Sequence, residues 1–454
     1  MPSPRPGRAP AAIRYAGSTE EGGDVLSRRV AVAPRGRSSR LGPLSWRTFD
    51  SLTRYRNFRL YFAGQTVSQL GSWLQSAAQA WMVLELTHSA FAVGLVTFWQ
   101  LGPYTLLGLV GGAISDRLDH RRSLIATQAG LGLCAVALAA IAFAHVHAID
   151  AIYAVAAARG TVMVLNNPSE QAFLLRMVGR ERLTNAISLN AGSMNATRVV
   201  GPALAGVLIA VAGVGVCFAL NALSFGAVIV SLLLVREAEL FPLVRRVLPG
   251  GVLADLREGF AYALRTPRIW VSLGVLAVIS TLGINFSVML PILAAQTLHS
   301  DAEVYGLITA LFGLGALGGA LLAASLGRPT WALVLGSGLL FSLFEIVLAP
   351  LSALGPVVPV LVATGFGYTL YAATTNAMVQ LSAPDGLQGR VMGLYNWIFF
   401  GTGPLGALLS GGLSAAGGTE LVFLLAGVGG VLVVLLAALV VRREVRPPTL
   451  SLSG

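Results

Sequence analysis

Residues 112–122 read Gly-Ala-Ile-Ser-Asp-Arg-Leu-Asp-His-Arg-Arg, and they join two apolar runs, 89–112 and 123–145. Each run is long enough to cross the hydrocarbon core of a bilayer. A short loop that carries three arginines between two such runs is typical of the cytoplasmic face, because positively charged loops are retained on that side. The loop therefore predicts a membrane protein and gives it an orientation.

The rest of the chain follows the same charge pattern. Its 31 basic residues are all arginines, and all except Arg159 and Arg198 fall in segments on the same face as the loop. The apolar runs predict twelve transmembrane helices, an even number that places both termini in the cytoplasm. They are expected at 61–84, 89–112, 123–145, 149–171, 186–212, 215–235, 270–296, 303–326, 330–350, 356–379, 392–414 and 419–441.

Composition excludes several other classes of protein. Apolar residues make up 55% of the chain and charged residues 11%, which a soluble domain could not accommodate on its surface. The net charge is +11, and the arginines that produce it lie beside the apolar runs. The expected partners are therefore anionic membrane lipids and not nucleic acid. Cys134 and Cys217 both fall within predicted spans, so neither a disulfide framework nor a metal site is expected. A chain without lysine has no Walker phosphate loop, and no cofactor is expected.

Five regions follow along the chain. We expect a disordered basic cytoplasmic tail over 1–55, a six-helix bundle over 56–235, a cytoplasmic linker over 236–269, a second six-helix bundle over 270–441 and a cytoplasmic tail over 442–454. The linker is expected to contain an amphipathic helix on the inner membrane surface, because apolar residues recur there at helical spacing opposite charged ones. The apolar residues are Val252, Leu253, Leu256, Phe260 and Leu264.

The two halves repeat short sequences. Gly94-Leu95-Val96-Thr97 in the second span recurs as Gly306-Leu307-Ile308-Thr309 in the eighth, and Gly201-Pro202 in the fifth recurs as Gly403-Pro404 in the eleventh. These repeats lie at corresponding positions of two six-span halves, which indicates an internal duplication of the kind found in secondary transporters. The predicted fold is an all-α integral membrane protein with twelve transmembrane helices in two pseudo-repeated six-helix bundles.

The loop 112–122 resembles the signature loop of the major facilitator superfamily. Asp119 stands where many members have a glycine, a variant common in the branch typified by the enterobactin exporter. Further resemblance to that efflux branch lies in residues 57–60, 167–173, 185–187, 198–206 and 389–392. The resemblance covers residues 55–441 and implies the major facilitator fold.

In that superfamily the loop is a latch between the two halves when the cytoplasmic face is closed. The resemblance implies that Asp116 docks near the start of the eleventh span, and Asp116→Asn is expected to abolish transport while expression is retained. The loop arginines can pair with carboxylates of neighbouring helices, for which Glu170 is a candidate. The predicted latch comprises Gly112, Asp116, Arg117, Asp119, Arg121, Arg122 and Glu170.

A second motif lies in the fifth span. Gly201, Pro202 and Gly206 resemble the centre of the antiporter motif, although Ser188, Thr197 and Ala205 replace three of its glycines. Small residues permit close helix contact, so the motif favours an interface between the halves, and a generic packing motif is the alternative. Arg198, just before the motif, is expected to support this interface.

Other polar residues inside spans are candidates for substrate and proton binding. Arg159 lies midway along the fourth span, where an unpaired charge costs several kcal/mol, so it either binds an anionic group on the substrate or forms a buried ion pair. Trp73, Gln75 and Gln79 of the first span are further candidates for the substrate cavity, or else make contacts between helices. Glu345 in the ninth span is a candidate for proton coupling, with a structural role as the alternative.

The sequence thus predicts a secondary active transporter and not an enzyme. The preferred function is proton-driven export of a small amphipathic compound such as a drug, a siderophore or a secreted metabolite. Proton-coupled uptake is the first alternative, and a membrane-embedded enzyme or sensor on the same scaffold is the second. The expected form is a monomer in the cytoplasmic membrane, with a small-molecule substrate, protons and membrane lipids as its partners.

Overall fold

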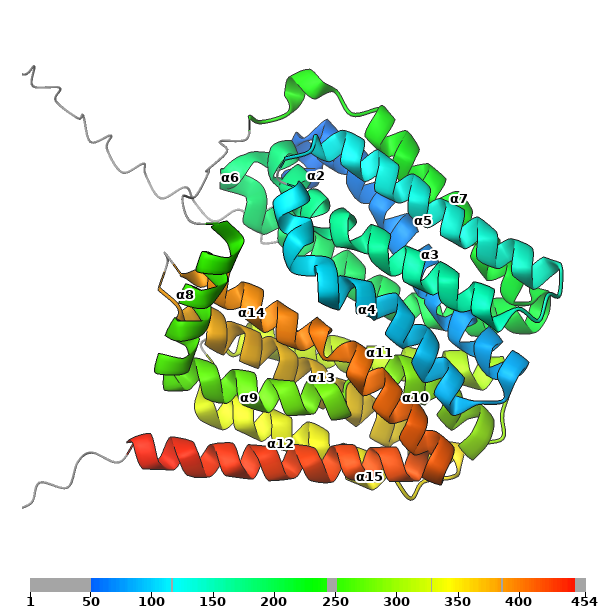
Figure 1. The fold of residues 1–454 in the computed structure, drawn as a ribbon, viewed down its shortest axis with the longest axis vertical. Helices are drawn as coiled ribbons and strands as arrows, with labels where there is room; N and C mark the ends of the chain where they lie inside the picture. The colour runs from blue at the N-terminus through cyan, green and yellow to red at the C-terminus, as the bar shows by residue number, and fades with distance from the viewer. Residues whose placement is uncertain (1–49, 116, 243–250, 328, 385–386, 446–454) are drawn as a thin grey trace, which may run out of the picture. The chain divides into compact units, whose positions relative to one another are not determined.

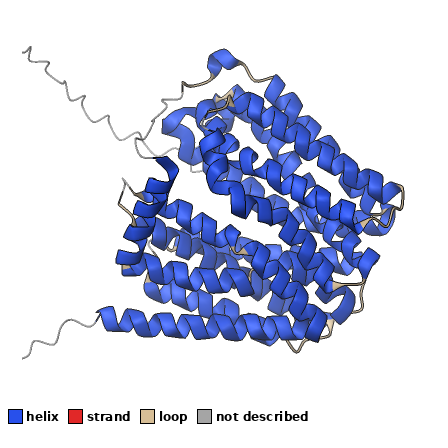
Figure 2. Ribbon diagram, viewed as in Figure 1, coloured by secondary structure: helices blue, strands red, loops and turns tan. Residues whose placement is uncertain are grey.

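The computed structural model describes residues 50–115, 117–242, 251–327, 329–384 and 387–445, which all belong to one compact unit. Every regular element among these residues is a helix (Figure 2). A helix lies over each of the twelve predicted spans, and the predicted all-α membrane fold is confirmed. Such a fold satisfies every backbone hydrogen bond within the helix, as a bilayer requires.

The first bundle consists of helices that pack mainly on one another (Figure 1). Its longest element, α6, holds two predicted spans and is broken at Gly179, whose φ of 68° is readily adopted only by glycine. The elements are α2 (Asp50–Arg54), α3 (Arg56–Thr87), α4 (Ala90–Ser115), α5 (His120–Phe143), α6 (Ile149–Ala212) and α7 (Val214–Leu233).

The second bundle is built in the same way, with breaks at three places. The seventh span is interrupted after α9 and resumes at α10. The eleventh span is divided at Thr402 between α14 and α15, and α15 is broken at Gly417 and Gly418 before the twelfth span. The elements are α9 (Pro267–Leu282), α10 (Phe286–Ile292), η2 (Leu293–Thr297), α11 (Ala302–Ser325), α12 (Trp331–Leu348), α13 (Leu354–Ser382), α14 (Gln388–Gly401) and α15 (Gly403–Val445).

Between the bundles lie the short helix η1 (Glu237–Glu239) and α8 (Gly251–Arg265), and α8 packs on α9 and α14. The helix falls within the linker in which an amphipathic helix was predicted. Ala263 is buried, whereas Phe260 and Leu264, one turn apart, are exposed. The side chains of Val252, Leu253 and Leu256 lie outside the described part.

Ten of the described helical stretches are long and apolar enough to cross a membrane. The difference from twelve has two sources. Helix α3, with its glutamines, falls below the required hydropathy, and residues 388–442 count as one stretch although the helix is broken at Gly418. Large apolar side chains such as Leu106 and Val211 are about 80% exposed, as expected for surfaces that face lipid.

The ends of the predicted regions need adjustment. Residues 50–54, the last part of the segment expected to be disordered, form α2, in which Asp50 pairs with Arg182 of α6 at 2.5 Å. The rest of the predicted tail, residues 1–49, lies outside the described residues. At the other end α15 continues to Val445, into the segment expected to be a tail.

The two halves meet mainly through two helix pairs, α4 with α15 and α6 with α11. For description, the arginine-poor end is the one that carries the loops 88–89, 144–148 and 298–301. The arginine-rich end is the one that carries 117–119 and 234–236. A cluster of aromatic rings fills the second half beside the interface, with the ring centroids of Phe286 and Phe312 at 4.3 Å.

Candidate functional site

A cavity of about 320 Å³ lies between the two halves. Helices α3, α4 and α6 line it from the first half, and α9, α10, α11, α13, α14 and α15 line it from the second. Its wall is mainly apolar and aromatic, with a few polar groups spaced around it, as is usual in sites for small organic molecules. The polar groups include Ser76, Gln79, Gln100, Arg198, Asn285 and Thr309.

Arg198 is the charged group in this wall. Its guanidinium carbon lies 5.7 Å from the ring centroid of Trp73 and 5.1 Å from that of Tyr368, so it makes cation–π contacts with an aromatic ring from each half. The sequence predicted that Arg198 supports the interface between the halves. Its side chain lines the cavity between them, and its backbone carbonyl faces Gly313 of α11.

The structure does not place Arg159, the predicted substrate-binding arginine, in the cavity wall. Its side chain is buried, with Cys134 of α5 nearby, and it makes no hydrogen bond or ion pair with the described residues. The next residue, Gly160, packs so tightly on the backbone of Gln100 that a β-carbon there would lie 2.1 Å from the Gln100 carbonyl oxygen. This contact fixes the rotation of the fourth span and keeps Arg159 out of the wall.

The polar residues of α3 divide between two environments. Trp73 and Gln79 line the cavity, as predicted from the sequence. Gln75 does not, because its side-chain oxygen accepts a 2.6 Å hydrogen bond from Asn221 of α7. Gln79 is 2% exposed, and neither its oxygen nor its nitrogen has a partner among the described residues. An unsatisfied buried amide is costly, and a ligand with hydroxyl or amide groups would relieve that cost.

At the arginine-poor end the halves touch backbone to backbone. A β-carbon on Gly306 of α11 would lie 2.7 Å from the Cα of Gly206 and 2.9 Å from the carbonyl oxygen of Pro202. A β-carbon on Gly94 of α4 would lie 2.4 Å from the carbonyl oxygen of Ala407 in α15. We call these two contacts the glycine seal.

The glycine seal gives the sequence repeats a structural meaning. The repeated Gly-Leu-x-Thr segments contain Gly94 and Gly306, and each of these packs on a helix that carries the repeated Gly-Pro pair. The first half thus contributes one member to each contact, and so does the second. Gly201, the other glycine of the fifth-span motif, packs on Trp73 of α3, where a β-carbon would lie 2.4 Å from the Trp73 Cβ.

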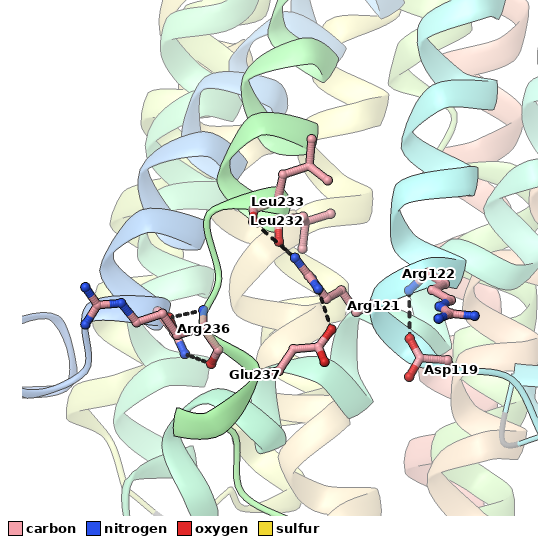
Figure 3. Close-up of polar contacts among 8 residues, drawn as sticks. Asp119, Arg121, Arg122, Leu232, Leu233, Arg236 and Glu237 are labelled. Carbon is pink, nitrogen blue, oxygen red and sulfur yellow. Dashed lines mark hydrogen bonds and ion pairs between the residues drawn. The ribbon is translucent and has the colours of Figure 1, made fainter.

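At the arginine-rich end Arg121 binds the end of α7 (Figure 3). Its Nε donates to the carbonyl oxygen of Leu232 at 2.9 Å, its Nη2 donates to that of Leu233 at 3.1 Å, and its Nη1 pairs with Glu237. A cation at the carboxyl end of a helix satisfies free carbonyls and the helix dipole. Arg121 therefore holds α5, α7 and the following turn together within the first half.

Among the described residues, the other members of the predicted latch make no hydrogen bond or ion pair that bridges the halves. Asp119 caps α5 by accepting from the Arg122 amide at 2.9 Å, and the side chains of Arg117 and Arg122 are exposed. Gly112 lies inside α4, and Asp116 lies outside the described residues. The ion pairs that the described residues make with one another, such as Arg390 with Glu258, stay within one half and its adjoining linker.

Glu170 is not paired with these arginines either. Its carboxylate accepts a 3.0 Å hydrogen bond from Gln65 of α3, and Tyr61 and Asn190 lie beside it. Asn190 in turn accepts from Gln69 at 3.1 Å. This polar network within the first half was not recognised from the sequence, because its members are scattered over α3 and both parts of α6.

Glu345 lies where the seventh span is broken. It is 1% exposed, and its carboxylate oxygens lie 2.8 and 2.9 Å from the position that a β-carbon on Gly283 would take. Among the described residues its side chain has no hydrogen bond or ion pair. The residues that follow Gly283, from Ile284 to Ser287, line the cavity, so the break connects Glu345 to the cavity wall.

A central cavity between two six-helix halves defines a transporter of the major facilitator class. Solved structures agree on the fold. A nucleoside transporter has a TM-score of 0.67 at 12% identity, with 84% of this chain and 99% of that chain covered. A POT family transporter in complex with 5-aminolevulinic acid has a TM-score of 0.69 at 12% identity, with 86% and 97% covered. Within that class the chain belongs to the transmembrane secretion effector family, whose model matches residues 48–450.

Three curated relatives are similar at the level of sequence. The enterobactin exporter of Shigella boydii is 27% identical over 364 residues, which cover 79% of this chain and 85% of the exporter. The multidrug efflux pump Tap of Mycolicibacterium fortuitum is 28% identical, covering 80% and 90%. The staphyloferrin A transporter of Staphylococcus aureus is 27% identical, covering 57% of this chain and 64% of that protein, just under two thirds of its length. The chain is therefore a multi-pass membrane transporter, and not an enzyme.

Proposed function

We propose that this protein exports a small amphipathic compound by alternating access. The observation that carries the proposal is the cavity between the halves, which the glycine seal closes toward the arginine-poor end. Two similar bundles that rock about a central site expose it to each face in turn. Two of the relatives, an enterobactin exporter and a multidrug efflux pump, support the outward direction.

The proposed location is the cytoplasmic membrane, with the arginine-rich end and both termini in the cytoplasm. The asymmetric distribution of arginine supports this orientation. In the conformation described here the cavity is then sealed from the outside. Because the two halves that line the cavity belong to the same chain, the monomer is the proposed functional unit.

Protons are the proposed coupling ion, with Glu345 as the carboxyl group that binds them. A charged carboxylate without a partner is costly at this depth in a bilayer, so the neutral, protonated form is favoured in the conformation described. A conformation that opened the break near Gly283 to water would favour release of the proton. Because the break borders the cavity wall, proton release and substrate binding would be coupled through the same segment.

The test is a comparison of small molecules in cells and medium, with and without the protein. Asp116→Asn is the control variant, because the signature motif predicts normal expression without transport. Loss of a compound from cells that contain the wild-type protein, abolished by a protonophore and by the variant, is the expected result. Accumulation of a compound in those cells would show that the direction of transport is uptake and not export. A compound converted into another, with no net movement, would indicate an enzyme.

A further inference from the structure

The charge of the cavity wall is unbalanced. Of the side chains that line it, Arg198 is the charged one, and the described lining residues include no carboxylate. Arg198 has no ion pair among the described residues, and its contacts are the rings of Trp73 and Tyr368. Among the described lining residues, no group of opposite charge balances the guanidinium of Arg198.

The ring contacts leave the hydrogen-bonding capacity of Arg198 unused. Aromatic faces interact with the charge of a guanidinium but accept its N–H groups poorly, and those groups lie in the plane of the guanidinium. The same planar arrangement of donors matches a carboxylate, phosphate or other bidentate anion. The two rings also hold the side chain in place, so little conformational entropy is lost when an anion binds.

The other residues of the cavity wall indicate which further chemical groups a ligand would carry. Gln79 offers an unpaired amide donor and an unpaired acceptor in the same wall. Phe286, Phe312 and Phe399 add flat apolar surfaces, on which a ring can stack. A ligand with a negative charge, a planar ring and a hydroxyl or amide group would satisfy all three features together.

We propose that the cavity selects anionic ring-bearing compounds, with Arg198 as the anion-binding residue and Gln79 as a hydrogen-bonding partner. This inference rests on the proposed function in taking the cavity as the substrate site. It narrows the substrate to anions and assigns their recognition to Arg198, not to Arg159. Organic cations of similar size and shape are rejected, because they would bring a second positive charge into the same low-dielectric space.

The test uses two dyes that share a xanthene ring and differ in charge. Fluorescein is an anion at pH 8 and rhodamine 6G is a cation, and fluorescence anisotropy measures their binding to the purified full-length protein in lipid nanodiscs. The wild-type protein is expected to bind fluorescein at least about tenfold more tightly than rhodamine 6G. Equal binding of the dyes, tighter binding of rhodamine 6G, or no binding of fluorescein would overturn the inference.

Variants of Arg198 test whether this residue causes the preference for the anionic dye. Arg198→Gln is expected to weaken fluorescein binding by about tenfold or more and to leave rhodamine 6G binding unchanged or stronger. Arg198→Glu is expected to reverse the preference, a gain of cation binding that a misfolded protein could not show. Arg182→Gln is the matched control, because it removes an arginine of the same helix that does not line the cavity. Its binding of both dyes is expected to equal that of the wild type. Equal loss of both dyes in Arg198→Gln, without reversal in Arg198→Glu, would mean that Arg198 has only a structural role.

Transport of the same dyes into everted vesicles separates this inference from the proposed function. If binding is charge-selective and depends on Arg198 but no bound compound is transported, the anion site is supported and export is contradicted. If rhodamine 6G and fluorescein are transported at the same proton-driven rate, the export proposal is supported and the selection of anions is contradicted.

Discussion

At the scale of single residues, the sequence identified the polar groups inside the membrane but not the direction in which each points. Arg159 and Arg198 are equally conspicuous in an apolar span, yet only Arg198 reaches the cavity. The rotation of each helix decides this, and it depends on contacts such as that of Gly160 with the Gln100 backbone. Gln75 and Gln79 are four residues apart, a spacing that suggests one face. A single hydrogen bond to Asn221 nevertheless turns Gln75 toward α7.

Glu345 provides the first prediction at this scale. Glu345→Gln keeps the neutral form of the side chain permanently, so we expect substrate binding and exchange to persist while proton-driven accumulation is lost. In proteoliposomes, counterflow should remain within about twofold of wild type, and uptake driven by a pH gradient should fall at least about tenfold. Glu303→Gln, an exposed acid at the start of α11, is the control and should leave both activities intact. Full proton-driven transport by Glu345→Gln would show that another group carries the proton.

Arg121 provides a prediction about stability. Arg121→Gln removes two hydrogen bonds to carbonyls at the end of α7 and the pair with Glu237, so we expect unfolding to become easier by about 1–2 kcal/mol. Thermal denaturation in detergent, followed by size-exclusion chromatography, would register this as a lower melting temperature. Arg122→Gln removes the same charge from the next position, where the side chain is exposed, and should leave the melting temperature unchanged. Equal melting temperatures for the two variants would contradict the structural role of Arg121.

At the scale of helices, the predicted spans agree with the observed ones because hydropathy averages over about twenty residues. The same averaging hides the breaks. Residues 270–296 were predicted as one helix, whereas α9 ends at Leu282 and α10 begins at Phe286. A change in φ and ψ at Asn285 or Gly418 leaves no trace in hydropathy. The break in the seventh span is nevertheless the feature that joins Glu345 to the cavity wall.

The glycine seal provides a prediction at this scale. Gly306→Ala places a methyl group within 3 Å of the α6 backbone, so the halves cannot approach fully at the arginine-poor end. Gly94→Ala is expected to act in the same way at the symmetry-related contact. Both variants should leave the cavity open to the outside, whereas Gly226→Ala in α7 meets no atom within 4 Å and is the control.

The measurement is the accessibility of a cysteine placed at Ser76 in the cavity wall. A membrane-impermeant thiol reagent added to intact cells should label Ser76→Cys faster in the Gly306→Ala and Gly94→Ala backgrounds than in the Gly226→Ala background. Protein without Ser76→Cys gives the background from Cys134 and Cys217, which are both buried. Equal labelling in all three backgrounds would mean that these contacts do not close the outer side.

At the scale of the whole molecule, the sequence was most informative. The number of spans, the fold class and the two related halves follow from properties summed over the whole chain, which single contacts cannot easily override. The predicted latch was harder to place because it describes contacts of one conformation only. In the conformation described, Arg121 acts within the first half, and the halves are held together by glycine contacts at the opposite end.

Orientation in the membrane provides the last prediction. If the arginine-rich end is cytoplasmic, an impermeant thiol reagent should label His147→Cys in intact cells and should label Glu239→Cys only after the cells are permeabilised. Both positions are exposed in loops or short turns at opposite ends of the molecule. The reverse pattern of labelling would place the arginines outside and would invert the proposed direction of transport.

The glycine seal also bears on how tightly the membrane is kept closed. At each contact, the atoms nearest to the position of the added β-carbon are main-chain atoms of the facing helix. Rotation of single side chains therefore does not part these two contacts, and only separation of the two bundles as whole bodies does. A carrier closed in this way is expected to conduct little leak current between cycles. Its dissipation of the membrane potential then depends on the number of substrate molecules transported and not on the number of transporter copies in the membrane.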